Sequence, residues 1–132
     1  MGQRNKQTKK QTKGKMKTIL IDDDMVGEVV QEILEIEGFN TIHPKTSQNS
    51  IDHASKNKID LIITDYKKPT MSIQKFITEI KSHCPNTPII MYTGYSKIDV
   101  VHVEGINEFI EKTFENEKLI PTIKKLLEEN PS

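Results

Sequence analysis

The sequence contains few aromatic residues and almost no cysteine. Aromatic residues make up 5% of the 132 residues and tryptophan is absent, so we expect a core of aliphatic side chains. Cys84 is the only cysteine, which excludes an intramolecular disulfide and is typical of a reducing, cytoplasmic location. No apolar run approaches the ~20 residues of a membrane-spanning helix, and no apolar segment of a secretory signal follows the basic start. We therefore expect no membrane association.

The net charge of zero conceals an uneven distribution of charge. Seven of the 19 basic residues precede Thr18, whereas all 19 acidic residues follow it, which leaves the rest of the chain with a formal charge of −7. Residues 1–16 lack apolar periodicity, so we predict a basic, disordered arm there. A solvated tail is the simplest interpretation of this arm. We expect contact with nucleic acid, if any, only through it.

Short apolar runs alternate with longer amphipathic segments in the rest of the chain. The apolar runs predict strands over residues 18–21, 40–43, 61–64, 89–92 and 107–110. The segments between and after them predict helices over residues 25–37, 47–58, 72–83, 97–103 and 115–129. Gly38 suits a left-handed cap after the first helix, and Pro121 should delay or kink the last one. In the first helix the inward positions are predicted to be Val26, Val29, Val30, Ile33 and Leu34.

Five strand–helix units predict a parallel sheet that is covered by helices on both faces. Right-handed crossovers restrict the topology, and the strand order 2-1-3-4-5 is the natural candidate. The predicted fold is therefore α/β, a flavodoxin-like, doubly wound (βα)5 three-layer sandwich. It occupies residues 17–129 as one domain, with residues 130–132 as a short tail.

Charged and hydroxyl side chains follow four of the predicted strands. They are Asp22 and Asp23, Asp65, Thr93 and Lys112. Because the carboxyl ends of parallel strands meet at one edge of a sheet, we expect these groups to converge. A carboxylate such as Asp65 can act as a nucleophile toward phosphorus, and a nearby Mg²⁺ held by Asp22 and Asp23 would neutralise the repulsion between anions. Lys112 would supply a point charge to a phosphoryl oxygen and Thr93 a hydrogen bond.

Together these residues resemble the receiver domain of two-component response regulators, in particular the single-domain, chemotaxis-regulator type. The resemblance extends over residues 17–129. Its motifs, in chain order, are Ile19–Asp24, Asp60–Asp65 with Pro69 and Met71, Pro88–Gly94 and Phe109–Lys112. Each motif is weak alone, but all four stand in the family's order and at strand ends.

The resemblance implies that Asp65 accepts a phosphoryl group from a histidine kinase or a histidine phosphotransfer protein. It also implies that Mg²⁺ is bound by Asp65, by Asp22 or Asp23, and by the backbone carbonyl of Lys67. The strand register favours Asp22 and Asp23 as the acidic pair. Counting back from Gly38 without a gap puts Asp22 in the second acidic position, and a one-residue deletion after the acidic run reconciles the two.

The resemblance further implies that Thr93 and Lys112 contact the phosphoryl oxygens, and that Phe109 is a rotating aromatic that reports phosphorylation at the surface. The protein would then be a phosphorylation switch for binding an unknown downstream protein, not an enzyme beyond its own phosphorylation chemistry. It would be a monomer or a phosphorylation-dependent dimer. Residues 130–132 are too few for a DNA-binding module, so we expect a stand-alone receiver.

Besides the phosphorylation switch, which is the first possibility, the sequence leaves two alternatives open. Lys67 and Lys68 replace a small residue and a methionine of the family, Thr113 replaces a proline, and the fourth helix is short. These departures are compatible with a degenerate receiver that binds proteins constitutively. The third possibility is a small phosphohydrolase that uses Asp22 as the nucleophile of a D-x-D motif, although this leaves Asp65 without a clear role.

Overall fold

Five parallel strands form one sheet in the computed structural model, which describes residues 16–130. The strands are β1 (Thr18–Asp22), β2 (Asn40–Ile42), β3 (Leu61–Thr64), β4 (Ile89–Thr93) and β5 (Glu108–Glu111). Their order is β2-β1-β3-β4-β5, and each neighbouring pair is parallel. This order confirms the predicted doubly wound topology. The predicted arm, apart from Met16, and the predicted tail after Asn130 lie outside the described residues.

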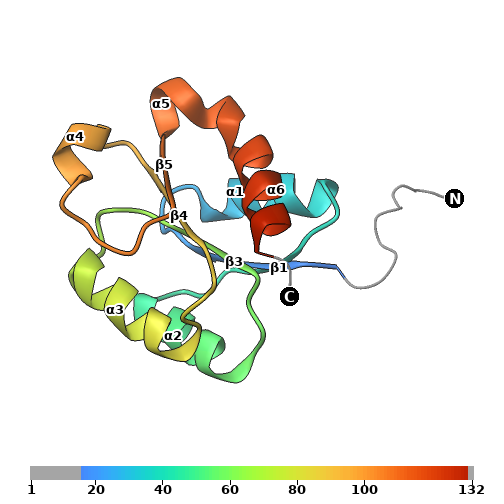
Figure 1. Cartoon of the computed structure of the whole chain (residues 1–132), viewed down its shortest axis with the longest axis horizontal. Coiled ribbons are helices and arrows are strands. Elements are labelled where there is room, and N and C mark those ends of the chain that lie inside the picture. The colour runs from blue at the N-terminus through green and yellow to red at the C-terminus, as the bar shows by residue number, and fades with distance from the viewer. Residues whose placement is uncertain (1–15, 131–132) are drawn as a thin grey trace, which may run out of the picture.

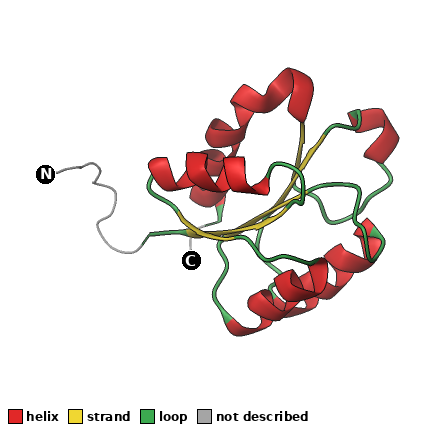
Figure 2. Cartoon of the chain, turned by 180° about the vertical axis from the view of Figure 1, so that it is seen from behind, coloured by secondary structure: helices red, strands yellow, loops and turns green. Residues whose placement is uncertain are grey.

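Helices cover both faces of the sheet, which gives the three predicted layers (Figures 1 and 2). They are α1 (Gly27–Ile36), α2 (Ser47–Lys56), α3 (Ile73–His83), α4 (Lys97–Val100), α5 (Lys112–Glu115) and α6 (Leu119–Glu129), with a 3₁₀ turn at Asn116–Lys118. The fourth helix is short, as expected. Pro121 is the third residue of α6, and the chain before it forms α5 and the 3₁₀ turn instead of one continuous helix. No helix within residues 16–130 is long and apolar enough to span a lipid bilayer.

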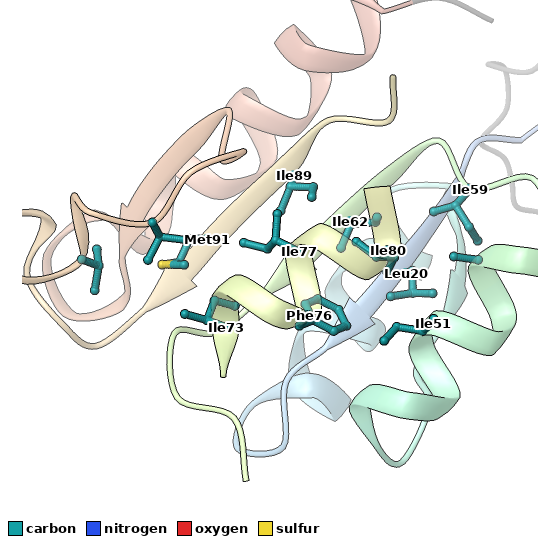
Figure 3. Close-up of a cluster of buried hydrophobic side chains, with 13 residues drawn as sticks. Leu20, Ile51, Ile59, Ile62, Ile73, Phe76, Ile77, Ile80, Ile89 and Met91 are labelled. Atoms are coloured by element: carbon teal, nitrogen blue, oxygen red, sulfur yellow. The ribbon is translucent and has the colours of Figure 1, made fainter. Parts of the chain in front are cut away.

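The core consists of two clusters, one on each face of the sheet. The cluster in Figure 3 joins the sheet to α2 and α3, and the aromatic side chain of Phe76 is fully enclosed in it. The second cluster joins the sheet to α1 and α6 through Val30, Leu34 and Ile123. Aliphatic side chains form most of both clusters, as the absence of tryptophan predicts.

The first helix buries a narrower stripe than its sequence predicts. Val30 and Leu34 are buried, whereas Val29 and Ile33 are exposed. The prediction for these two residues was wrong because periodicity identifies an apolar face but not how much of it a neighbouring layer covers. The helix also begins at Gly27 and not at residue 25, since the carboxylate of Asp23 accepts the backbone N–H groups just before it.

Candidate functional site

The candidate site lies at the carboxyl ends of four adjacent strands. Parallel pairing sets Asp22 opposite Thr64 and Thr93 opposite Glu111. Asp65 therefore follows β3 directly, and Lys112 opens α5 directly after β5. The sheet thus delivers the predicted residues to one edge of the molecule.

One carboxylate oxygen of Asp65 is hydrogen-bonded to a backbone N–H group, and the other contacts a lysine ammonium group. Its Oδ1 accepts the backbone N–H of Tyr66 at 2.6 Å, and its Oδ2 accepts a hydrogen bond from Lys112 Nζ at 3.1 Å. The side chain of Asp65 is 14% exposed, so it is accessible to a small reactant from one side. A carboxylate fixed in this way retains unused acceptor positions on both oxygens.

The ammonium group of Lys112 also contacts Asp23. Asp23 Oδ1 accepts the backbone N–H groups of Met25 at 2.9 Å and Val26 at 3.1 Å, which stabilises the turn into α1. Its Oδ2 is buried 3.0 Å from Lys112 Nζ, and no donor within residues 16–130 meets this oxygen with hydrogen-bond geometry. A buried carboxylate oxygen without a well-formed hydrogen bond is a candidate ligand for a cation.

The Lys112 ammonium is held between two carboxylates. Burial by itself lowers the pKa of Lys112, but the contact with Asp23 and the charge of Asp65 outweigh burial, so the pKa is raised above its ordinary value. The ammonium also lies over the ring of Tyr92, 5.6 Å from its centre. Burial raises the pKa of Tyr92, which keeps its phenol neutral beside these charges. Lys112 is therefore a permanent cation next to Asp65 at neutral pH.

Asp22 lies in a different cluster from Asp23. Its carboxylate forms a buried ion pair with Lys68, and its Oδ1 accepts a hydrogen bond from Ser50 Oγ at 2.8 Å. The hydroxyls of Ser47 and Thr64 both lie 3.4 Å from its Oδ2. Asp22 is the last residue of β1, whereas Asp23 lies in the turn before α1, so the two carboxylates meet different neighbours.

Sequence reasoning did not predict two of these contacts. The sequence marks Lys68 as a departure from the family but does not indicate its burial against Asp22. His43 stands in no motif, and its Nε2 lies 3.1 Å from the backbone oxygen of Asp23. No local pattern indicates either contact, because each joins segments that are distant in the chain.

Thr93 and Phe109 flank a small internal space beside the site. Thr93 is 2% exposed, and its Oγ1 accepts the backbone N–H of Tyr95 at 3.4 Å. Phe109 is half-buried and packs against the core on the side of α2 and α3. A cavity of about 10 Å³ lies between them, which is room for about one water molecule.

A wider cavity of about 470 Å³ opens over Asp65. Its walls include Asp24, Lys67, Lys112 and the apolar side chains of Met25, Val26, Pro69 and Tyr95. The Lys67 side chain is exposed at its rim. The cavity is large enough to admit a phosphoryl donor to the carboxylate.

Asp65 in the wall of this cavity and Asp23 buried behind Lys112 are oxygen donors of the kind that a hard divalent cation prefers. No group of three or more His, Cys, Asp or Glu side chains within residues 16–130 forms a closed metal site. Mg²⁺ does not need one, because it takes one or two protein carboxylates and keeps several waters. The buried, poorly paired Oδ2 of Asp23 and the partly free carboxylate of Asp65 meet that requirement.

Comparison with known proteins is consistent with this geometry. The sequence model described as "Response regulator receiver domain" matches residues 18–124. The cell cycle transcriptional regulator CtrA of Caulobacter vibrioides is 28% identical over 112 residues, which are 82% of this chain and 48% of CtrA. Sporulation initiation phosphotransferase F of Bacillus subtilis is 26% identical over 114 residues, which are 83% of this chain and 92% of that protein.

The chain thus spans about half the length of CtrA and most of phosphotransferase F. A solved structure shares the fold: the response regulator TrrA of Thermotoga maritima, crystallised in complex with Mg²⁺-BeF, is 28% identical with a TM-score of 0.75. The alignment covers 85% of this chain and 100% of that one. The family model covers most of the chain and the fold matches, so the chain belongs to the family of response regulator receiver domains.

Proposed function

We propose that this receiver domain accepts a phosphoryl group on Asp65 and acts as a Mg²⁺-dependent phosphorylation switch for partner binding. The donor would be a histidine kinase or a histidine phosphotransfer protein. The observation that carries the proposal is the Lys112 ammonium, which lies 3.1 Å from Asp65 and 3.0 Å from Asp23 at the floor of an open cavity. A cytoplasmic location is part of the proposal.

In the proposed reaction a carboxylate oxygen of Asp65 forms a bond to phosphorus while the phosphorus–nitrogen bond of a phosphohistidine breaks. The leaving imidazole nitrogen keeps the electron pair and takes up a proton from solvent. Lys112 stabilises negative charge on the phosphoryl oxygens. Asp23 and Asp65 would hold Mg²⁺ with the backbone carbonyl of Lys67, and bound Mg²⁺ would neutralise charge between the two anions.

We leave Asp22 out of this proposed metal site, because its oxygens already contact Lys68 and three hydroxyl groups. The predicted readout through Thr93 and Phe109 stays in the proposal. Thr93 and Phe109 border the same small cavity, so a movement of Thr93 toward a phosphoryl group would change the packing around Phe109.

Acetyl phosphate with Mg²⁺ tests the proposal directly. Intact-protein mass spectrometry should show one added phosphoryl group on the wild type and none on Asp65→Asn. The same adduct on both proteins would place the chemistry on another residue. Absence of an adduct on the wild type would overturn phosphoacceptor function.

One observation favours a second candidate, a degenerate receiver that binds its partner constitutively. Lys68 neutralises Asp22, which removes one of the expected acidic groups from the metal site. Nuclear magnetic resonance spectra recorded with Mg²⁺ and beryllofluoride separate the two functions. The switch predicts shifts of the backbone amides near Asp65 and Thr93, whereas a degenerate receiver predicts none. The same burial of Asp22 argues against a phosphohydrolase with Asp22 as nucleophile.

A further inference from the structure

Lys68, three residues after Asp65, places a buried cation against the carboxylate of Asp22. Its side chain is 3% exposed, and its Nζ forms an ion pair with the Asp22 carboxylate. The same Nζ donates to the backbone oxygen of Asp22 at 3.0 Å and lies 3.4 Å from Thr64 Oγ1. It also lies over the ring of Phe76, 5.2 Å from the centre. One ammonium therefore joins the carboxyl ends of β1 and β3 to the loop that follows Asp65.

Both oxygens of the Asp22 carboxylate are already engaged. Lys68 and the hydroxyls of Ser47 and Thr64 contact Oδ2, and Ser50 Oγ donates a hydrogen bond to Oδ1. Mg²⁺ would have to break a buried ion pair to reach it, and this leaves a buried ammonium uncompensated. Asp23 is also ion-paired, with Lys112 Nζ 3.0 Å from its Oδ2, but no hydroxyl or amide donor within residues 16–130 meets that oxygen.

We propose that Lys68 is an internal counter-ion that withholds Asp22 from the metal site and thereby sets the Mg²⁺ affinity of this receiver. The inference rests on the proposed function and deepens it, because it identifies the residue that limits metal binding. Lys68 is a positioning residue in this role, since it acts through Asp22 and not on the phosphoryl group. Its removal should release a second acidic group to the site.

Mg²⁺ titration of the metal-binding step tests the proposal without any phosphoryl donor. Isothermal titration calorimetry gives the dissociation constant, and tyrosine fluorescence gives a second readout. The chain has no tryptophan, and Tyr66, Tyr92 and Tyr95 are its three tyrosines, all close to the site. Lys68→Met should bind Mg²⁺ about tenfold more tightly than the wild type, a change of the size that residues supporting metal ligands produce.

Lys67→Met is the matched control, because it removes a cation from the same loop without releasing Asp22. Its gain in Mg²⁺ affinity measures the effect of removing one positive charge from the loop. The gain in Mg²⁺ affinity of Lys68→Met should be larger. The double variant Asp22→Asn/Lys68→Met should lose this excess and bind Mg²⁺ within about twofold of the wild type. The double variant lacks both the carboxylate of Asp22 and the ammonium group of Lys68, so it leaves no unpaired buried charge. It can therefore be titrated even where Lys68→Met alone is too unstable.

Two results would overturn the proposal. One is an equal gain in Lys67→Met and Lys68→Met. The other is a loss of about tenfold or more in the affinity of Asp22→Asn, which would make Asp22 a ligand in the wild type. Both leave the proposed function intact, because that function depends on the phosphoryl adduct at Asp65 and not on the relative affinities of these variants.

Discussion

At the scale of single residues, one ammonium group holds the reactive edge together. Lys112 Nζ lies within 3.1 Å of an oxygen of both Asp23 and Asp65, two carboxylates that would otherwise repel each other. The attraction to these two carboxylates raises the pKa of Lys112. Lys112 therefore contributes to stability as well as to the proposed chemistry.

The variant Lys112→Met should lower the free energy of unfolding at pH 7 by about 1–3 kcal/mol, because it leaves the buried Oδ2 of Asp23 without the cation beside it. A lysine whose folded pKa is raised stabilises fully below its unfolded pKa of ~10.4, and loses that contribution as pH rises through the folded value. The stability difference between wild type and variant should therefore shrink above about pH 10.4. Urea titrations at a series of pH values measure it.

Lys124→Met is the control for this prediction, since Lys124 pairs with Glu37 at the surface and its side chain is 57% exposed. It should change stability little at any pH. A stability difference for Lys112→Met that stays constant to the highest pH would show that lost packing, and not charge, causes the effect.

At the scale of elements, the start of α1 depends on close contact between Gly27 and His43. A methyl group on Gly27 would lie 2.1 Å from His43 Nε2, which is closer than any real contact. That nitrogen lies 3.1 Å from the backbone oxygen of Asp23. The helix that follows the acidic run is thus positioned by a histidine from the segment after β2.

Gly27→Ala should destabilise the protein, although alanine favours a helix over glycine by about 1 kcal/mol. The added methyl group must displace the His43 ring from Asp23. In a His43→Ala background the same substitution should become neutral or stabilising, because the space is then open. Thermal unfolding of the four proteins of this double-mutant cycle measures the coupling. Equal effects of Gly27→Ala in both backgrounds would exclude the ring as the cause.

At the scale of the whole molecule, one sheet is shared by two hydrophobic clusters. Neighbouring residues of β3 serve opposite faces: Ile62 packs toward α2 and α3, and Ile63 packs toward α1 and α6. Neither cluster can form without the strands that carry the other. We therefore expect the domain to unfold in one cooperative transition.

Ile62→Val and Ile63→Val should each lower the free energy of unfolding by about 0.5–1.5 kcal/mol, since each removes one buried methylene group. Both variants should shift the same transition, followed by circular dichroism for the helices and by tyrosine fluorescence for the site edge. Two separate transitions, or a variant that shifts only one probe, would show that the faces unfold independently.

The sequence by itself determined the strand order, the layers and the edge at which Asp65, Thr93 and Lys112 lie. Hydrophobic periodicity and the parallel arrangement of strand–helix units are local or topological rules, so they can be read along the chain. Only the tertiary structure decided which acid faces Lys112 and which is buried against Lys68. It also decided that Val29 and Ile33 stay exposed. These outcomes depend on what each side chain meets across the fold, and contacts between distant segments are not encoded in local spacing.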